Sequence, residues 1–356
     1  MKLLSLLPFC LLLASGCSSE DASSPEGPSP DAASVDGSLT DSSSDGAMTD
    51  APPDSNLTSD GSVLPDSTAD SVVAADAASD SPDPSKPRFF RADSLWNTPV
   101  SNEPVQWYDI PAIRSGCWYV NYQAYSNPVV LGADSDPVVV VPAPASWGWP
   151  ATELKIHVPS GVTGATGTDG SLVVISDNVA YDFWQFVRTS ETTATVVAWA
   201  QANIITGTGW ADPNAGKAAG IRAGGSAGLA GEIYGNELTE GIHHALGIAA
   251  VIEISGLGGE HRPPAVSGDG PMEGLRLGIP PSTPKPAGLS VQGSHFWDAL
   301  VTYGGWLADR AYGSCPILFN ADPRSVPQAD VDALHGDIDK IRDHVRIIDY
   351  AYPYNP

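Results

Sequence analysis

Two apolar runs decide the fold class, Leu172-Val173-Val174-Ile175 and Ala180-Tyr181-Asp182-Phe183-Trp184-Gln185-Phe186-Val187. Both are rich in β-branched and aromatic residues, and turn-forming residues separate them, a pattern typical of β-strands. Runs of the same kind lie nearby at 128–131, 137–141, 154–158 and 193–199. The sequence therefore predicts a mainly β fold, an antiparallel sandwich or a barrel-like arrangement. Gly167-Thr168-Asp169-Gly170 is expected to form a tight turn between two strands.

A few peripheral α-helices are expected in the second half of the chain. Asn236 can cap one that runs to 249, with one apolar face made of Leu238, Ile242, Ala245, Leu246 and Ala249. Ser294 can cap a second helix that ends before Gly304-Gly305. A capping-box pattern at 325–328 predicts a third helix, which runs through Val345.

The chain begins like an exported protein. Met1-Lys2 precedes an apolar run that is too short to span a bilayer. This run ends in Leu11-Leu12-Leu13-Ala14-Ser15-Gly16-Cys17, which resembles the lipobox of bacterial lipoproteins. The resemblance implies a signal peptide at 1–16, a lipid on Cys17 that anchors the protein to a membrane, and an extracytoplasmic place in the cell envelope, on the surface of the outer or plasma membrane. The alternative is an ordinary secretory signal with an incidental cysteine.

Composition divides the rest of the chain at Lys86-Pro87. Residues 18–87 hold 15 acidic residues, one lysine and no aromatic residue, so 17–87 is predicted to be a lipidated cysteine followed by a disordered linker. Residues 88–356 contain every tryptophan and are predicted to form a single globular domain. With 27 acidic against 15 basic residues, this domain is not expected to bind nucleic acid or a polyanionic polysaccharide. A neutral or cationic ligand fits better.

Two cysteines, Cys117 and Cys315, lie in the predicted domain. In an exported protein such a pair most often forms a disulfide, which we expect here. Two buried thiols are the alternative, and two cysteines alone cannot build a metal site.

The segment 237–246 is the first candidate for chemistry. On a helix, Glu237, Glu240 and His244 would share one face, because they are three, four and seven residues apart. A carboxylate beside an imidazole can act as a general acid–base pair. The alternatives are a solvent-facing ion pair or a metal site, but the sequence offers no obvious further ligand. No metal and no cofactor are expected.

Tryptophans near carboxylates suggest carbohydrate recognition. On a strand, Asp182 and Trp184 would share a face, where an indole stacks on a sugar ring and a carboxylate accepts hydrogen bonds from its hydroxyls. The alternative places Trp184 in the core and Asp182 at an edge. Trp147 and Trp149 are a weaker stacking candidate, or else a loop packed by its own rings.

The glycine-rich segment 220–231 is not expected to bind phosphate, because it lacks the Gly-Lys-Ser/Thr ending of a phosphate-binding loop. Its glycines allow the backbone to pack closely or to approach a ligand. Ser226 lies in no Gly-x-Ser-x-Gly sequence, so we do not expect it to be a hydrolase nucleophile.

An ordered set of motifs resembles an uncharacterised family of secreted bacterial proteins. The motifs are SLWNTP at 94–99, GTDG at 167–170, DFW at 182–184, GIHHAL at 241–246, GDG at 268–270 and YGG at 303–305. The likeness spans nearly all of 89–312. It implies no particular reaction, but it favours Asp169, Asp182, His244 and Asp269 as residues to test.

These observations predict a surface lipoprotein that engages a glycan, and leave two hypotheses open. One is an enzyme that cleaves glycosidic bonds, with His244 or Asp182 as acid/base, Asp169 or Asp269 as the carboxylate partner, and Glu240 as a further candidate. The other is a non-catalytic glycan-binding or envelope-structural protein that stacks sugars on Trp147, Trp149 and Trp184. The enzyme requires His244, Asp182 and Asp169 to converge on one cleft, whereas a binding protein requires exposed indoles and scattered carboxylates.

Overall fold

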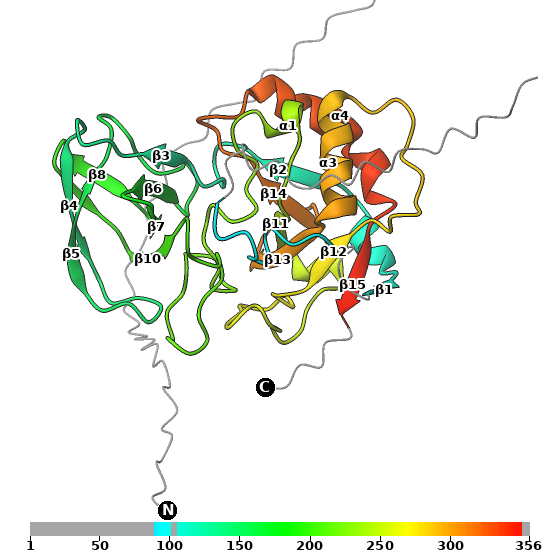
Figure 1. The fold of residues 1–356 in the computed structure, drawn as a ribbon, viewed down its shortest axis with the longest axis horizontal. Helices are drawn as coiled ribbons and strands as arrows, with labels where there is room; N and C mark the ends of the chain where they lie inside the picture. Colours follow the sequence, from blue (N-terminus) through cyan, green and yellow to red (C-terminus); the bar gives the residue numbers. More distant parts are fainter. Residues whose placement is uncertain (1–88, 101–104, 351–356) are drawn as a thin grey trace, which may run out of the picture. The chain divides into compact units, whose positions relative to one another are not determined.

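The computed structural model describes residues 89–100 and 105–350 (Figure 1). These residues belong to one compact unit. The predicted signal peptide, Cys17 and the linker lie outside the described residues. Within the described part, strands in three sheets dominate and the α-helices are short, so the prediction of a mainly β fold is confirmed. No helix among these residues has the length and apolar character needed to cross a membrane.

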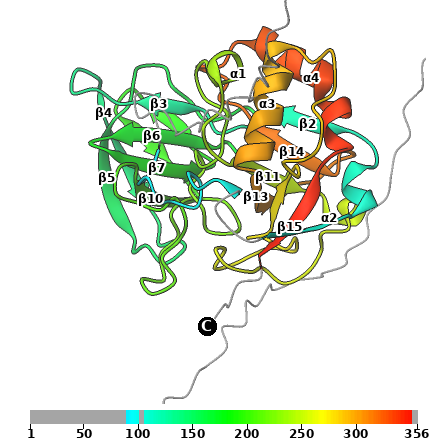
Figure 2. The same cartoon turned by 45° about the vertical axis from the view of Figure 1, so that its right-hand side comes forward.

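Two four-stranded sheets form a sandwich. One has the order β10-β7-β6-β3 and the other β5-β4-β9-β8. The strands of the first sheet are, in that order, Ala198–Asn203, Val179–Trp184, Leu172–Ser176 and Val129–Leu131. Those of the second sheet are Thr152–His157, Val138–Ala143, Thr193–Thr195 and Val187–Ser190. Figure 2 shows β6, β7 and β10 side by side in the first sheet. Leu172 and Val174 of β6 face the core between the sheets, whereas Val173 and Ile175 belong to a second core on the opposite face.

Two predicted strands are each divided between the sheets. The run 180–187 breaks at Gln185, whose φ of 56° bends the chain, so β7 ends at Trp184 and Val187 begins β8. The run 193–199 likewise splits into β9 and β10. The predicted turn at 167–170 forms, with the Gly170 amide donating to the Gly167 carbonyl. It does not join two paired strands, and the tight hairpin is instead Asp177-Asn178 between β6 and β7.

A seven-stranded mixed sheet forms the rest of the described fold, in the order β1-β15-β12-β13-β11-β14-β2. The bounds in that order are Val105–Tyr108, Arg346–Tyr350, Arg276–Gly278, Gly305–Arg310, Leu246–Ala250, Ile317–Asn320 and Trp118–Asn121. The helices α3 (Val291–Thr302) and α4 (Gln328–Arg342) lie side by side against it (Figure 1). Their apolar side chains, such as Phe296 and Leu334, share one core with Leu246 and Ile248 of the sheet.

Two of the three predicted helices are confirmed with shifted ends. Helix α3 begins at Val291, where the Ser290 hydroxyl accepts a hydrogen bond from the Gly293 amide, and not at a Ser294 cap. Helix α4 ends at Arg342, before Val345. Its predicted capping box is wrong, because the Ser325 hydroxyl instead donates to Asp322 Oδ2.

The helix predicted at 236–249 is wrong. A single turn, α1 (Glu237–Glu240), ends at Gly241, whose φ is 111°. The following apolar residues form β11, which is buried along its whole length between β13 and β14. A short buried apolar run fits a helix or a strand equally well by periodicity. The remaining helical segments are α2 (Ile252–Ser255) and a 3₁₀ turn at Pro111–Arg114.

The predicted disulfide between Cys117 and Cys315 is confirmed, with the two Cα atoms 4.7 Å apart. Cys117 immediately precedes β2, and Cys315 lies two residues before β14. These strands pair in parallel from Trp118 opposite Ile317. The disulfide therefore ties the edge strand β2 to its only neighbour in the described sheet.

Removing this disulfide should destabilise the protein substantially. It joins two residues that are 198 positions apart, so its loss increases the conformational entropy of the unfolded chain. The free energy of unfolding should therefore fall by about 2–5 kcal/mol. For Cys117→Ser/Cys315→Ser we expect a Tm roughly 5–20 °C below wild type in a thermal melt. A reductant should lower the Tm of the wild type and leave that of the double variant unchanged. Equal melting of wild type and variant would contradict this role.

Candidate functional site

The structure does not gather the three predicted acid–base residues. Two large cavities are found in the described part of the chain, and His244, Asp182 and Asp169 line neither. His244 borders a separate cavity of about 20 Å³. Asp169 is half-buried and accepts a hydrogen bond of 3.5 Å from the Trp184 indole. The convergence that the enzyme hypothesis requires of these three residues is therefore not seen.

Asp182 is fully buried and is held by the glycine-rich segment. It lies opposite Val173 in the β6–β7 ladder, on the face turned away from the sandwich core. Its Oδ2 atom accepts a hydrogen bond from the Gly228 amide. A Cβ atom on Gly220 would collide with Asp182 Oδ2. The glycines thus allow the backbone to pack closely, and what they approach is a carboxyl group of the protein itself.

Arg222 lies at the centre of a buried polar cluster. Its guanidinium donates to the Gly228 carbonyl at 3.2 Å and lies 3.7 Å from Asp309 Oδ2. The Asn320 amide, oriented to satisfy its neighbours, accepts hydrogen bonds of 2.9 and 3.2 Å from the same guanidinium. Arg222 also attracts Asp182 electrostatically. This one cation therefore connects strands β7, β13 and β14.

The carboxyl groups around Arg222 hold their protons unusually tightly. Burial raises the pKa of Asp182 to about 7 and the pKa of Asp309 to about 6, although the positive charge of Arg222 works against both shifts. Burial likewise raises the pKa of Glu232 well above its ordinary range, and Asp322 adds to the effect. A buried carboxylate costs free energy unless it is compensated, so Asp182 and Asp309 take up protons near neutral pH.

Glu237 and His244 meet, although no helix carries both. His244 Nε2 lies 3.1 Å from Glu237 Oε1, and His244 Nδ1 lies 2.9 Å from the Ala245 carbonyl. The imidazole ring is thus held between a backbone carbonyl and a carboxyl group. Glu240, the third member of the predicted array, accepts a hydrogen bond of 3.4 Å from Asn236. The pair joins α1 to the start of β11.

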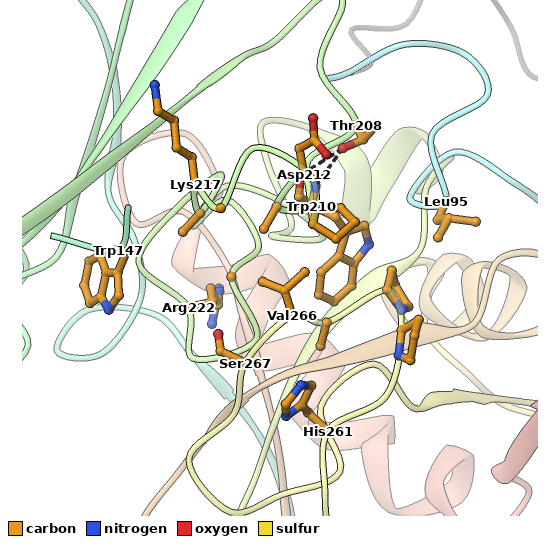
Figure 3. A pocket seen from close by; sticks show the side chains of 18 of the residues that line it. Leu95, Trp147, Thr208, Trp210, Asp212, Lys217, Arg222, His261, Val266 and Ser267 are labelled. Carbon is orange, nitrogen blue, oxygen red and sulfur yellow. Dashed lines mark hydrogen bonds between the residues drawn. The ribbon is translucent and has the colours of Figure 1, made fainter. Parts of the chain in front are cut away.

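The larger cavity, which we call the groove, has a volume of about 870 Å³. Its lining comes from residues 91–95, Trp147, 208–218, 222–225 and 261–267. Figure 3 shows Trp147 and Leu95 on opposite sides of the groove, with Arg222 and Val266 between them. Trp147 is 43% exposed. A cavity of this size, lined by aromatic, apolar and a few charged residues, is typical of ligand-binding sites.

The turn that presents Trp147 is held rigidly. The Trp147 carbonyl accepts a hydrogen bond of 3.0 Å from the Ala218 amide, and the Trp149 indole donates one of 2.8 Å to the Ala218 carbonyl. Lys217 Nζ lies 4.4 Å from the centre of the Trp149 ring. Trp149 is therefore engaged in packing, as the alternative interpretation of this loop expects, and Trp147 is the indole that faces the groove.

Trp210, Asp212 and His261 also line the groove, although no pattern in the sequence singled them out above. Trp210 is nine-tenths buried and stacks on Trp96 with ring centres 5.1 Å apart. Its indole N–H has no hydrogen-bond partner among the described residues. The signal available in the sequence was Trp210-Ala211-Asp212, an indole two residues from a carboxylate in an irregular stretch.

Three carboxyl groups gather behind the groove residues Arg222 and Ser267, and one of them is the predicted Asp269; none of the three lines either large cavity. The Asp269 amide donates to Glu273 Oε1 at 3.0 Å, and Glu273 is fully buried. The Asp309 side chain is about 30% exposed, and its carboxyl group accepts a hydrogen bond from the Ala223 amide. The hydroxyl of Ser267, which lines the groove, donates to the Ala223 carbonyl at 2.6 Å. We call Asp269, Glu273 and Asp309 the carboxyl cluster.

Burial raises the pKa of Glu273 to about 7, and the neighbouring Asp269 carboxyl contributes to this shift. Within the part of the chain that the structure describes, no three His, Cys, Asp or Glu side chains are arranged to hold a metal ion.

Comparison of the chain with protein-family models, curated proteins and solved structures finds no match.

The raised pKa values predict a pH dependence of stability. The folded protein keeps a proton on Asp182 up to about pH 7, whereas the unfolded chain releases it near pH 4. The free energy of unfolding should therefore fall as the pH rises from about 4 to about 7, by up to about 1.4 kcal/mol per pH unit for this group. It should level off above pH 7.

Urea unfolding at a series of pH values, for the wild type and Asp182→Asn, checks this. The variant cannot release that proton, so its stability should fall less steeply across the same interval. Parallel curves for the two proteins would show that Asp182 is ionised in the folded state throughout.

Proposed function

We propose that this chain is an exported, lipid-anchored protein that binds a neutral or cationic glycan in the groove. The observation that carries the proposal is Trp147, an exposed indole on a rigid turn at the edge of a cavity of about 870 Å³. Indole faces stack on the C–H faces of sugar rings, and a rigid aromatic side chain loses little conformational entropy on binding.

Polar groups in the groove suit a ligand rich in hydroxyls. The Trp210 ring gives the groove an aromatic wall, although its N–H group is buried. The carboxylate of Asp212 and the ring of His261 add hydrogen-bonding groups around the same cavity. Stacking surface and scattered polar groups together favour a sugar over a purely apolar ligand.

Charge supports the choice of a neutral or cationic glycan. Three cationic side chains line the groove, and each has a partner. Arg91 forms an ion pair of 2.8 Å with Asp93, Arg222 forms one of 3.7 Å with Asp309, and Lys217 lies over the Trp149 ring. The groove therefore offers no concentrated positive charge for a polyanion, in keeping with the acidic composition of the domain.

Two features support a place outside the cytoplasm. The disulfide between Cys117 and Cys315 is of a kind that persists in oxidising compartments. The lipobox-like sequence ending at Cys17 would supply a membrane anchor. Together they suggest a protein of the cell envelope whose groove meets extracellular polysaccharide.

Trp147→Ala should weaken glycan retention strongly. Loss of the stacking surface is expected to lower affinity about tenfold, because an aromatic stacking contact contributes about 0.5–1.5 kcal/mol beyond the area it buries. The full chain is passed over immobilised cellulose, chitin, chitosan and mannan, with alginate as the polyanionic control. Tyr119→Ala is the matched control variant, since Tyr119 is 45% exposed and lies outside both large cavities. If the wild-type protein binds to none of the four neutral or cationic polysaccharides, the proposal is overturned.

Cleavage of the bound glycan is a second candidate function, and the carboxyl cluster favours it. Glycosidases use one carboxyl group that holds a proton and another that is ionised. Asp309 is partly exposed with a pKa raised to about 6, and Asp269 is exposed beside it. We assign acid–base work to these two residues in preference to Asp182, which is sealed in the core.

Asp269→Asn distinguishes cleavage from binding alone. If the protein is a glycosidase of this kind, release of reducing sugar from the retained polysaccharide should fall at least about 100-fold, while retention stays unchanged. Asp177→Asn, in the exposed β6–β7 turn, serves as the matched control. Retention by the wild type without any release of product would leave the binding function and exclude the catalytic one.

A further inference from the structure

A second cavity, of about 750 Å³, borders the groove. Leu95, His261, Pro263 and Pro264 line both cavities. The two spaces are therefore neighbours that share one wall. We call the second space the side cavity and the shared Pro263-Pro264 segment the ridge.

The ridge is fixed in place from behind. The Arg262 amide donates to the Glu273 carbonyl at 2.8 Å, and the Ala265 amide donates to the Arg262 carbonyl at 3.0 Å. Gly274, with a φ of 85°, passes so close that a Cβ atom there would collide with the Arg262 carbonyl. The ridge thus keeps its position without a ligand, and its prolines present no N–H donor that a bound chain would have to satisfy.

The side cavity shares the mixed apolar and charged lining of the groove, but no Trp, Tyr or Phe side chain lines it. Met272 and Leu275 give it an apolar wall, and Glu260, Arg262 and Asp349 give it charged hydrogen-bonding groups. Acidic and basic side chains again occur together, so this cavity also favours no polyanion. Two adjacent spaces of similar size and similar mixed character suit successive units of one linear molecule better than two unrelated ligands.

We infer that the ligand is a linear oligosaccharide or polysaccharide that crosses the ridge and occupies the groove and the side cavity at once. This inference rests on the proposed glycan-binding function and adds to it the length of the ligand. A polymer held at two joined sites gains affinity from each, because engagement of the second site is intramolecular once the first is filled.

The experiment is a chain-length series. Binding of the full chain to cello-, chito- and manno-oligosaccharides, from disaccharide to hexasaccharide, is measured by calorimetry for three proteins. These are the wild type, Glu260→Gln/Arg262→Gln in the side cavity, and Glu153→Gln/Lys155→Gln as a matched control. The control pair is an exposed ion pair of 3.3 Å on β5, outside both cavities.

Wild-type affinity should rise about tenfold or more from disaccharide to hexasaccharide, as expected if the longer chain makes hydrogen bonds in the side cavity. The side-cavity variant should lose that gain and bind the disaccharide as the wild type does, and the control variant should behave as the wild type throughout. Affinity that is already complete with the disaccharide, or a full gain in the side-cavity variant, would overturn the inference and leave the proposed function standing. Absence of binding to every oligosaccharide, and to the immobilised polysaccharides, would overturn both.

Discussion

The fold depends on the buried cation Arg222, which has more carboxyl groups around it than it can neutralise. Arg222 contacts Asp309 at the end of β13 and Asn320 at the end of β14, and it attracts Asp182 on β7. A guanidinium removed from water costs free energy unless its charge is compensated, and the two terminal nitrogens of Arg222 find their partners on β13, β14 and the Gly228 carbonyl. The surplus of carboxyl groups is resolved by protonation, which burial promotes.

This constraint also shapes the groove. The segment that carries Arg222 has no helix or strand of its own, and backbone hydrogen bonds hold it instead. The Gly224 amide donates to the Ala308 carbonyl, and the Ala227 amide donates to the Gly209 carbonyl. Glycine is required where the segment passes Asp182. The groove wall is therefore an irregular chain fixed to two sheets, and an irregular segment can be rigid when its polar groups are satisfied.

The sequence predicted the features that local chemistry determines, and missed those that depend on distant partners. The strands around Leu172 and the pairing of Cys117 with Cys315 follow from residue type and from the expected compartment. The corner at Gln185 and the strand at Leu246–Ala250 depend on which sheet receives the chain, and no local pattern encodes that choice. In the candidate site, Trp147 was identified from residue type and Asp269 from the motif resemblance, whereas Trp210 and Arg222 became visible only once the loop around them was placed.

A raised pKa by itself does not identify a catalytic residue in this protein. Asp182 and Asp309 both have pKa values raised by burial, and both lie near Arg222. Asp182 is wholly enclosed, so a ligand has no access to its carboxyl group. Asp309 keeps about 30% of its side chain exposed beside Asp269, so a ligand can reach it. The distinction between a structural and a chemical role therefore rests on access to solvent, because a general acid must touch the bond it cleaves.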